Sequence, residues 1–595
     1  MYVVRGIKHA VFLATIFSTI ATAQSLQPEA ASGTASRATV HTQQFMAVTA
    51  NRYATDAAVT IMKNGGNAVD AVLAAQWTLT LVEPQSSGIG GGAFLLHWQA
   101  DSKKVTSWDG RETARRGNDG EGGTTSANAA SKSFFRRSDG SAAGFADMIA
   151  TGRAVGAPGV VPMLKQAHQA HGKLPWAKTF EYAIALADNG FEVSPRLNKL
   201  LTDDAFLRKD PTAFALYYNA DGSPKAVGVR LKNPALAKTL RAIAAAGPSA
   251  MQTGDIAQSI ISAMLARGAK ADEILNLADL ADYVAKQRDP VCAPYRIWRL
   301  CSMGPPSSGG ITVLQILAHL EYANAAMADP MSPAAAHAFV ESSRLAFADR
   351  GRYLADPDFI RIPQAEMLDP SYLAQRAKLI NPERTMPNAP PGDLPQKLAL
   401  ADDDSLEIPA TTHLSIVDAE GNAVAMTSSV ESAFGSRIGV GGFLLNNQLT
   451  DFSWSFEKEG KPVANRMEPG KRPLSSMAPT FIFDADGKLY AVLGSAGGPR
   501  IINYVARAVS GLLDGKLDPS AAVALPHVGP RPGATDVERG TAAEAMIGEL
   551  EKRGHVISKS EMTSGTHLIV RETVNGKSGW AGGVDPRREG VAAGD

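Results

Sequence analysis

Cysteine is almost absent from this sequence, which contains two among 595 residues, Cys292 and Cys301. A hairpin with Arg296 and Ile297 at its tip would bring them opposite each other. In an oxidising, exported setting such a pair favours a disulfide across two strands, with two free buried thiols as the alternative. No histidine is near the pair in the sequence, so a metal site there is disfavoured. We expect neither cysteine to take part in catalysis.

An excess of charge of either sign is also missing. Lysine and arginine together number 59, aspartate and glutamate 59, and no basic run occurs. Binding to nucleic acid or to an anionic membrane surface depends on such an excess, so both partners are disfavoured. With 45% hydrophobic and 20% charged residues, the composition is that of a globular, enzyme-sized chain.

No apolar run is long enough to span a bilayer. The best candidate, residues 10–20, follows Arg5 and Lys8 and precedes Ala21-Thr22-Ala23. A charged start, a short apolar stretch and an A-x-A site are typical of a secretory signal peptide. We therefore predict that residues 1–23 are removed and that the mature protein is periplasmic or secreted, with an uncleaved anchor as the minor alternative.

Nucleotide-binding signatures are missing as well. Residues 83–92 end in three glycines, but no Gly-Lys-Ser/Thr follows and the predicted helix precedes the loop instead of following it. Close packing of backbone beside a site is the preferred interpretation. His168 and His171 have a spacing that two metal ligands on a helix could have, but no third ligand is in sight, so a solvated helix face is favoured.

The most informative stretch begins at residue 411. Residues 384–410 are rich in proline and acidic side chains and predict an exposed linker, after which an alternating strand opens with Thr411-Thr412-His413. A threonine becomes a nucleophile when a base takes its proton. Its own α-amine, with a pKa of about 7.7–8.0, can do so once the chain is cut before it. We predict cleavage of the Ala410–Thr411 bond and a catalytic Thr411.

Two β-rich runs flank a turn cluster at residues 418–422 and predict a hairpin. With the turn centred on Glu420, Thr411 stands opposite Ser429, within reach of a hydrogen bond between the two hydroxyls. Because strand side chains alternate, Glu431 falls on the same face. A slip of one residue would break this pairing. Taken alone, the stretch favours an ordinary amphipathic hairpin.

Two further segments carry candidate functional groups. Arg111 can clamp a carboxylate through paired hydrogen bonds, although a surface ion pair with Asp109 or Glu112 is the commoner use of such a residue. Gly497 and Gly498 can present backbone N–H groups to an oxyanion because neither has a Cβ that blocks approach, although a Gly-Gly turn alone is nearly uninformative.

Taken in order, eight motifs resemble those of the gamma-glutamyltransferase (gamma-glutamyl transpeptidase) family of self-processing N-terminal-nucleophile (Ntn) hydrolases. The resemblance extends over residues 46–590, and the eight together are highly specific although any one could arise by chance. The motifs are residues 65–70, 83–92, 109–113, 305–310, 411–413, 445–452, 471–477 and 494–498.

The resemblance implies an α/β fold, a four-layer αββα sandwich. It also implies a chain cut into a large subunit, residues 24–410, and a small catalytic subunit, residues 411–595. Within the large subunit, residues 115–144 are rich in glycine, serine and alanine, and we predict a flexible surface insertion with no part in the chemistry.

A role for each residue of the site follows from the same resemblance. Thr411 is the nucleophile, Ser429 supports its hydroxyl where the family usually has a second threonine, and Gly497 and Gly498 form the oxyanion hole. Glu431 departs from the asparagine of many members and adds a carboxylate near the donor's ammonium. The remaining donor contacts are Arg111, Ser475 and Ser476 for the α-carboxylate, and Gln448 and Asp451 for the α-ammonium.

The implied enzyme transfers γ-glutamyl groups without a cofactor or a metal. Thr411 attacks the γ-glutamyl amide of glutathione or a related compound, and water, an amino acid or a dipeptide then takes the acyl group. The two subunits form a heterodimer. The scaffold also resembles acylases that act on glutaryl-type side chains of β-lactams, which would not need the acidic Asp451 and Glu431. An unprocessed, non-catalytic binding protein is the second alternative.

Overall fold

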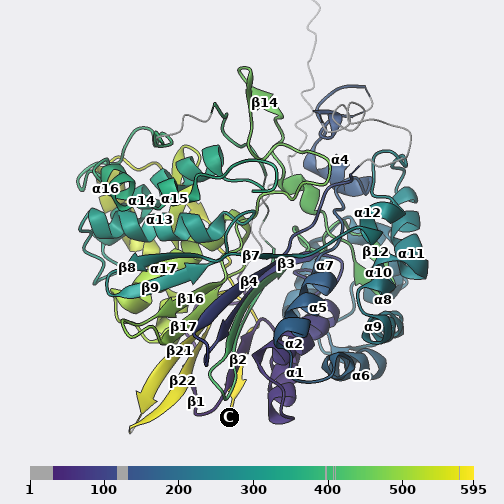
Figure 1. Cartoon of the computed structure of the whole chain (residues 1–595). Coiled ribbons are helices and arrows are strands. Elements are labelled where there is room, and N and C mark those ends of the chain that lie inside the picture. Colours follow the sequence, from purple (N-terminus) through teal and green to yellow (C-terminus); the bar gives the residue numbers. More distant parts are fainter. Residues whose placement is uncertain are drawn as a thin grey trace, which may run out of the picture.

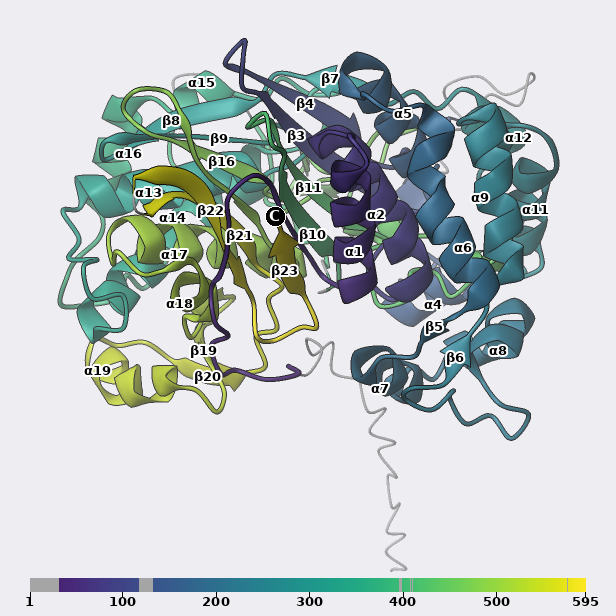
Figure 2. The same cartoon turned by 90° about the horizontal axis from the view of Figure 1, so that it is seen from below.

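Two seven-stranded antiparallel sheets lie face to face at the centre of the molecule, and helices cover their outer faces (Figures 1 and 2). Sheet A has the order β1 (Val40–Thr42), β22 (Lys577–Val584), β21 (His567–Val574), β17 (Leu489–Gly494), β16 (Thr480–Phe483), β9 (Trp298–Ser302), β8 (Val291–Tyr295). Sheet B has the order β23 (Val591–Gly594), β2 (Met46–Thr49), β10 (Thr412–Val417), β11 (Ala423–Ser429), β3 (Gly92–Gln99), β4 (Lys104–Gly110), β7 (Lys286–Arg288).

The computed structural model describes residues 31–116, 132–137, 139–394, 399–406, 408, 410–574 and 576–595. The predicted signal peptide, residues 1–23, lies outside this part of the chain. In the part described, no helix is both long and apolar enough to cross a membrane.

The space between the sheets is filled by side chains that alternate along each strand. Met46 and Val48 on β2 pack against Phe481 and Val492 of sheet A, whereas Ala47 faces the helices on the other side. Strands buried on both faces have apolar residues at consecutive positions, because each face has its own core. The predicted four-layer αββα sandwich is confirmed.

Each outer helix layer closes a separate core. One layer packs on sheet B, and it contains or adjoins α1 (Arg52–Lys63), α2 (Ala68–Val82), α4 (Phe145–Ala150), α5 (Val160–His171), η1 (Trp176–Phe180), α6 (Glu181–Asn189), α7 (Pro195–Asp203), η2 (Leu207–Lys209), α8 (Pro211–Tyr217), α9 (Pro234–Ala246), α10 (Ser249–Gln252), α11 (Gly254–Leu265) and α12 (Leu277–Ala281). The other packs on sheet A, with α13 (Gly309–Tyr322), α14 (Pro333–Tyr353), α15 (Gln364–Met367), α16 (Pro370–Ala377), α17 (Ile501–Leu513), α18 (Pro519–Ala524), η5 (Ala542–Met546) and α19 (Ile547–Lys552).

Short elements complete the fold around these four layers. The small sheets are β5 (Phe191–Glu192) with β6 (Arg230–Leu231), β12 (Gly439–Val440) with β13 (Phe443–Leu444), β14 (Glu457–Lys458) with β15 (Lys461–Pro462), and β18 (Val528–Arg531) with β19 (Ala534–Glu538) and β20 (Ile557–Ser560). Two single helical turns, η3 (Gln448–Asp451) and η4 (Gly498–Arg500), carry predicted site residues.

The hairpin β8–β9 has the predicted register. Cys292 pairs with Cys301 across the two strands, and Arg296 at the tip has a positive φ of 55°, as a tight turn requires. The two sulfurs are joined in a disulfide. Because β8 is an edge strand of sheet A, this bond ties the edge to its neighbour β9.

The predicted exposed linker, residues 384–410, is partly packed against the protein in the residues that the structure describes. Leu394, Leu400 and Ala410 are buried, and Gly392 N–H donates to the Asp349 carboxylate at 2.8 Å. Pro387, Asn388 and Asp402 are exposed as predicted. The burial of Leu394 and Leu400 was not predicted, because composition reports on the absence of a self-contained core, whereas these side chains complete the core of the helices beside the linker.

The predicted surface insertion, residues 115–144, is also partly wrong. Residues 117–131 and 138 lie outside the described chain, but Phe134 and Phe135 are 5% and 8% exposed. They form a small core with Leu449 and Phe452, and the Phe135 ring stacks on Trp454 at 4.4 Å between ring centres. Two aromatic residues are enough to dock a segment whose overall composition is polar.

His168 and His171 do not lie on a solvated helix face. The His168 ring bonds to the Leu174 carbonyl at 2.8 Å, and the His171 ring stacks on His97 with 4.0 Å between centres. The His171 ring thus packs between α5 and sheet B, whereas the His168 ring packs against Trp176 of η1. Among the described residues, no group of three or more histidine, cysteine, aspartate or glutamate side chains is arranged to hold a metal ion.

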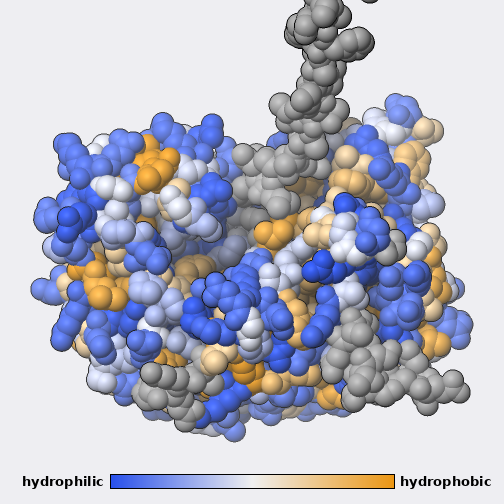
Figure 3. Space-filling view, turned by 90° about the horizontal axis from the view of Figure 1, so that it is seen from above, coloured by the Kyte–Doolittle hydropathy of each residue, from blue (hydrophilic) through white to orange (hydrophobic). Residues whose placement is uncertain are grey.

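The face seen in Figure 3 is mainly hydrophilic, with hydrophobic residues in several separate groups. Most of the large apolar side chains are instead in the three cores on either side of the sheets and between them. The sheet pair therefore forms the centre of the molecule, where β10 in sheet B contacts β17 and β21 in sheet A and β11 contacts β17.

Candidate active site

Thr411 and Ser429 stand opposite each other at the open end of the β10–β11 hairpin. The ladder pairs Thr412 with Ser428 and Val417 with Ala423, which is the predicted register. Thr411 Oγ1 donates a hydrogen bond to Ser429 Oγ at 3.1 Å, and the Glu431 N–H donates to the same oxygen at 2.9 Å. The predicted contact between the two hydroxyls is present, and the Ser429 oxygen accepts two hydrogen bonds.

The peptide bond before Thr411 is buried, and the backbone of Thr411 itself is strained. Ala410 is fully buried and Thr411 is 4% exposed. Thr411 has φ of 112°, a region that a β-branched residue rarely occupies because its side chain collides with the backbone. The strain therefore lies in the backbone of the residue that directly follows the bond predicted to be cut.

Gly91, in the run 83–92, allows another strand to approach this end of the hairpin closely. A Cβ on Gly91 would lie 2.0 Å from the Ser429 carbonyl oxygen, and one on Gly90 would lie 2.1 Å from that of Leu444. No side chain fits in either place. The interpretation of these glycines as close backbone packing beside a site is confirmed.

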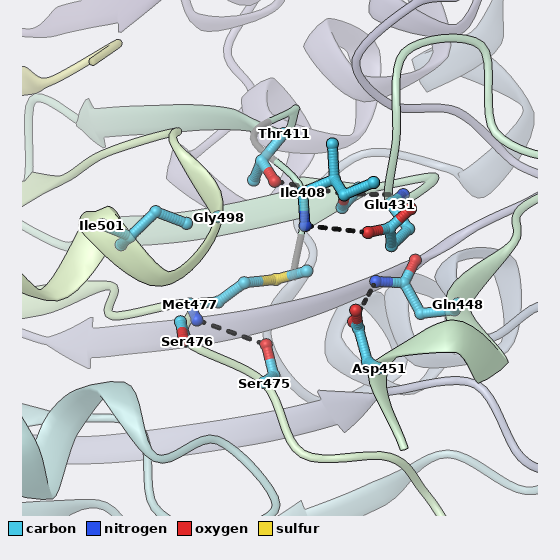
Figure 4. A pocket seen from close by; sticks show the side chains of 11 residues that line it. Ile408, Thr411, Glu431, Gln448, Asp451, Ser475, Ser476, Met477, Gly498 and Ile501 are labelled. Atoms are coloured by element: carbon cyan, nitrogen blue, oxygen red, sulfur yellow. Dashed lines mark hydrogen bonds between the residues drawn. The ribbon is translucent and has the colours of Figure 1, made fainter. Parts of the chain in front are cut away.

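Glu431, Gln448 and Asp451 gather on one side of the cavity next to Thr411 (Figure 4). Gln448 Nε2 donates to Asp451 Oδ2 at 3.1 Å, and Asn447 Nδ2 donates to Glu431 Oε2. Burial raises the pKa of Glu431 well above its ordinary value, and the negative charge of Asp451 raises it further. This side of the cavity is thus suited to a positively charged ligand group.

Arg111 lies behind Asp451 and does not line the cavity in this form of the chain. Its side chain is fully buried, and Nη2 donates to Asp451 Oδ2 and to the Leu474 carbonyl, each at 2.6 Å. Nη1 is 3.6 Å from Glu112 Oε2 and makes no hydrogen bond with any described residue. The sequence was also compatible with a surface ion pair for Arg111, which its burial excludes.

Ser475 and Ser476 line the cavity opposite the acidic side. Arg350, on α14, donates from Nη2 to Ser476 Oγ at 2.9 Å and from Nε to Ser308 Oγ at 2.7 Å. The Ser308 hydroxyl in turn donates to the Ser475 carbonyl at 2.6 Å. Both serines are therefore held by a buried network of Ser308 and Arg350, which precede the predicted cleavage point in the sequence.

Gly497 and Gly498 connect β17 to α17 at the third side of the cavity. Their φ angles are 131° and 59°, and a Cβ on Gly497 would lie 2.5 Å from the Tyr504 ring. Conformation and space both require glycine here. Gly498 lines the cavity together with Thr411.

Ile408 of the linker occupies the same cavity. Its N–H donates to Glu431 Oε1 at 3.1 Å, and only about 20 Å³ of free space is left, room for about one water molecule. Nearby, Asp404 accepts hydrogen bonds from the Ser453 and Ser455 hydroxyls at 2.7 and 2.5 Å. In the uncut chain the linker therefore fills the space that a substrate would need.

The sequence profile of the Gamma-glutamyltranspeptidase family matches residues 54–595, which include every residue of this cavity. The chain belongs to that family.

Two curated relatives of this transpeptidase-family chain are named glutathione hydrolase proenzyme. That of Pseudomonas sp. (strain A14) is 32% identical over 587 residues, covering 94% of this chain and 96% of the relative. That of Escherichia coli (strain K12) is 34% identical over 549 residues, covering 89% of each. A third, the Acylase ACY 1 proenzyme of Pseudomonas sp. (strain SE83), is 31% identical over 523 residues, covering 87% of this chain and 88% of the relative.

Two solved structures of other proteins have a fold similar to that of this chain. A cephalosporin acylase from Bacillus halodurans superposes with a TM-score of 0.79 at 24% identity, over 96% of this chain and 99% of the other. The gamma-glutamyltranspeptidase of Helicobacter pylori superposes with a TM-score of 0.51 at 27% identity, over 57% of this chain and 92% of the other.

Four residues at this transpeptidase-family site were not predicted from the sequence. Ile408, Met477 and Ile501 line the cavity, and Arg588 donates to the Thr411 carbonyl oxygen at 2.6 Å. Met477 ends one of the eight motifs, which was a usable signal. The sequence around Arg588 indicates only a docked terminus, because nothing local links it to a strand 177 residues earlier.

Proposed function

We propose that this protein is a glutathione hydrolase and γ-glutamyltransferase that creates its nucleophile by cutting its own chain before Thr411. The observation that carries the proposal is the Thr411 hydroxyl, bonded to Ser429 at 3.1 Å, in a cavity that also presents Asp451. Membership of the gamma-glutamyltranspeptidase family and relatives named glutathione hydrolase proenzyme support it.

Self-cleavage breaks the bond that precedes the strained Thr411 backbone. Thr411 Oγ attacks the Ala410 carbonyl carbon, the C–N bond breaks, and the amine leaves with a proton while an ester links Ala410 to the Thr411 oxygen. Water then hydrolyses the ester and frees the hydroxyl, the α-amine and the Ala410 carboxylate. Strain of the kind present at Thr411 is worth about 1–3 kcal/mol and is released by the cut. Mature subunits of residues 24–410 and 411–595 result.

Cleavage also opens the site. The free space beside Ile408, about 20 Å³, is far smaller than a ligand pocket of about 300 Å³ or more. Once the chain is cut, residue 408 is two residues from a free end, and the hydrogen bond from Ile408 to Glu431 is among the contacts that must break. Cutting and opening therefore belong to one maturation step.

Donor recognition follows from the charges around the cavity. A γ-glutamyl group carries an α-ammonium and an α-carboxylate. Asp451, Gln448 and Glu431 suit the ammonium. Ser475, Ser476 and Arg111, whose Nη1 makes no hydrogen bond with a described residue, suit the carboxylate. Because Arg111 and Asp451 already bond to each other, an incoming zwitterion adds one charge of each sign to an existing pair.

In turnover the free α-amine of Thr411 acts as base for its own hydroxyl. The hydroxyl attacks the γ-glutamyl amide carbon, the oxyanion is held by the N–H groups of Gly497 and Gly498, and the amine of the leaving group departs with a proton. The resulting γ-glutamyl ester is then attacked by water, giving hydrolysis, or by the amine of an amino acid or dipeptide, giving transfer.

A glutaryl-type acylase is the second candidate, because one relative is named an acylase. Glutaryl groups have the carboxylate but no ammonium, so the acidic side chains Asp451 and Glu431 would have no partner. Rates on γ-glutamyl and glutaryl anilides distinguish the two. Preference for γ-glutamyl that falls in Asp451→Asn supports the transferase, and equal rates on both anilides support the acylase. A non-catalytic binding protein would act on neither.

The deciding experiment is N-terminal sequencing of every band from the purified protein and from Thr411→Ala. We expect a fragment beginning Thr-Thr-His-Leu-Ser in the natural protein and a single uncut chain without activity in the variant. A cut Thr411→Ala chain would remove Thr411 from the mechanism. Sequencing the large fragment also tests the proposed export, because a start at Gln24 indicates removal of residues 1–23 and passage into the periplasm or medium.

A further inference from the structure

The segment 585–590 near the C-terminus lies behind the nucleophile. Arg588 Nη1 donates a hydrogen bond to the Thr411 carbonyl oxygen at 2.6 Å, and the arginine is only 1% exposed. A guanidinium keeps its charge at any pH in the working range, and a hydrogen bond from a charged donor is among the stronger ones in proteins. One fixed cation is thus buried against the backbone of Thr411.

The side chain of Arg588 lies in a slot that admits little else. A Cβ on Gly565 would lie 2.9 Å from Arg588 Cδ and 3.1 Å from Ala496 Cβ. Ala496 directly precedes Gly497, so the arginine stem packs beside the turn proposed to hold the oxyanion. The slot fixes the direction of the guanidinium toward Thr411.

The backbone that carries Arg588 is anchored by the opposite end of the chain. Arg37 donates from Nη2 to the Arg588 carbonyl at 2.7 Å and from Nη1 to the Gly590 carbonyl at 2.6 Å. The neighbouring Arg587 has a different task, because it pairs with Asp585 and Glu538. Arg588 is therefore the arginine of this segment that contacts the catalytic strand.

We propose that Arg588 is a positioning residue that holds Thr411 by its carbonyl and places a positive charge beside its α-amine; the inference rests on the proposed role of Thr411. Cleavage removes the Ala410–Thr411 bond and with it the restraint on the amine side of Thr411. The carbonyl bond from Arg588 and the hydroxyl bond to Ser429 remain to hold the residue in place.

A cation beside the α-amine disfavours its protonation, because like charges repel. The free amine must be unprotonated to act as base, and an ordinary α-amine has a pKa of about 7.7–8.0. Arg588 therefore extends the range in which the base is ready toward lower pH.

The other ionisable groups around Thr411 either favour protonation of its α-amine or have little effect on it because they are neutral or paired. Asp451 and Glu431 favour a protonated amine, but burial raises the pKa of Glu431, and Asp451 pairs with Arg111. His413, on the same strand, and His567, on β21, are kept neutral, because burial lowers both pKa values, that of His567 to about 4. Arg500 pairs with Asp536, and Arg437 pairs with Asp204. Among the described residues, Arg588 is the cation that contacts Thr411 directly.

The test compares Arg588→Lys, Arg588→Gln and Arg588→Met with the natural enzyme, on kcat, KM and the pH profile of kcat/KM for a γ-glutamyl anilide. Lysine keeps the charge, glutamine keeps a neutral donor and methionine keeps neither. We expect kcat to fall at least tenfold in Arg588→Met with KM changed less than threefold, and lysine to recover more of kcat than glutamine. The acidic limb should move to higher pH in the glutamine and methionine variants and stay in place with lysine.

Arg539→Gln, a change at an exposed arginine, is the matched control and should behave as the natural enzyme. An Arg588→Met protein that is cut normally, melts normally and has unchanged kcat and pH profile overturns the proposal. If Arg588→Met does not fold, equal kcat and equal acidic limbs in the lysine and glutamine variants overturn it instead. Activity remaining in Thr411→Ala would show that the proposed function itself is wrong, a separate outcome.

Discussion

At the scale of single residues, the hydroxyl of Ser429 is the closest support of the nucleophile. Its oxygen accepts from both Thr411 Oγ1 and the Glu431 N–H. A threonine at 429 would keep that oxygen, which is why a serine can stand where relatives of this type are expected to have threonine. The methyl group that threonine has and serine lacks affects packing and not the chemistry.

We predict that Ser429→Ala lowers kcat by about 10- to 100-fold, the size expected when a buried hydrogen-bonding group loses its partner, whereas Ser429→Thr stays within a few-fold of the natural enzyme. The measurement is kcat for a γ-glutamyl anilide together with the extent of chain cutting. Similar kcat values for the alanine and threonine variants would mean that the 3.1 Å contact has no catalytic role.

Glu112 gives a pH prediction at the same scale. It is fully buried, neither carboxylate oxygen makes a hydrogen bond with a described residue, and burial raises its pKa to about 8 despite the nearby Arg111. From about pH 4.5, where it titrates when unfolded, up to about 8, the folded protein retains a proton that the unfolded chain has lost. Rising pH therefore lowers the free energy of unfolding through this group.

Glu112→Gln should remove this contribution. The variant is expected to lose less stability than the natural protein between pH 5 and pH 8.5, by on the order of a few kcal/mol. Urea unfolding of both proteins at the two pH values measures it. Parallel losses in the two proteins would show that Glu112 does not retain its proton in the folded state.

At the scale of elements, the β8–β9 hairpin is stapled by a disulfide that closes a short loop of sequence separation 9. Such a loop predicts about 2–3 kcal/mol of stabilisation by restricting the unfolded chain. Neither cysteine lines the cavity, so removal of the disulfide should lower stability and leave catalysis unchanged.

We expect Cys292→Ser/Cys301→Ala to lower the melting temperature and leave kcat unchanged. Dithiothreitol should lower the melting temperature of the natural protein to a similar value and have no effect on the double variant. A natural protein whose melting temperature resists complete reduction of the thiols would contradict the stabilising role.

At the scale of the whole molecule, strands from both sides of the proposed cut interleave in each sheet. In sheet B, β2 from the large subunit lies between β23 and β10 from the small one. In sheet A, β1, β9 and β8 of the large subunit flank four strands of the small one. Separating the subunits would break ladders in both sheets and expose all three cores.

The cut protein should therefore behave as one unit. We predict that the two fragments elute together in size exclusion under native conditions and unfold in a single transition, separating only in denaturant. The uncut Thr411→Ala chain provides the reference elution volume. Elution of the fragments as two smaller species would show that the interleaved strands do not hold them together.

The sequence by itself determined what depends on neighbours along the chain. The turn at residues 418–422 is local, so the register that places Thr411 against Ser429 could be predicted and was confirmed. The same holds for the 292–301 hairpin. Local backbone chemistry also marked Gly90 and Gly91 as positions of close approach.

Only the tertiary structure decided which distant groups meet. Arg111 reaches Asp451 across 340 residues, and Arg588 reaches Thr411 across 177, contacts that no local pattern encodes. Residues 384–410 and 115–144 read as exposed because their composition lacks a core of its own, yet Leu394 and Phe135 are buried in cores built by other segments. Burial is a property of the assembled layers, since a side chain is removed from water by neighbours that the chain brings to it from elsewhere.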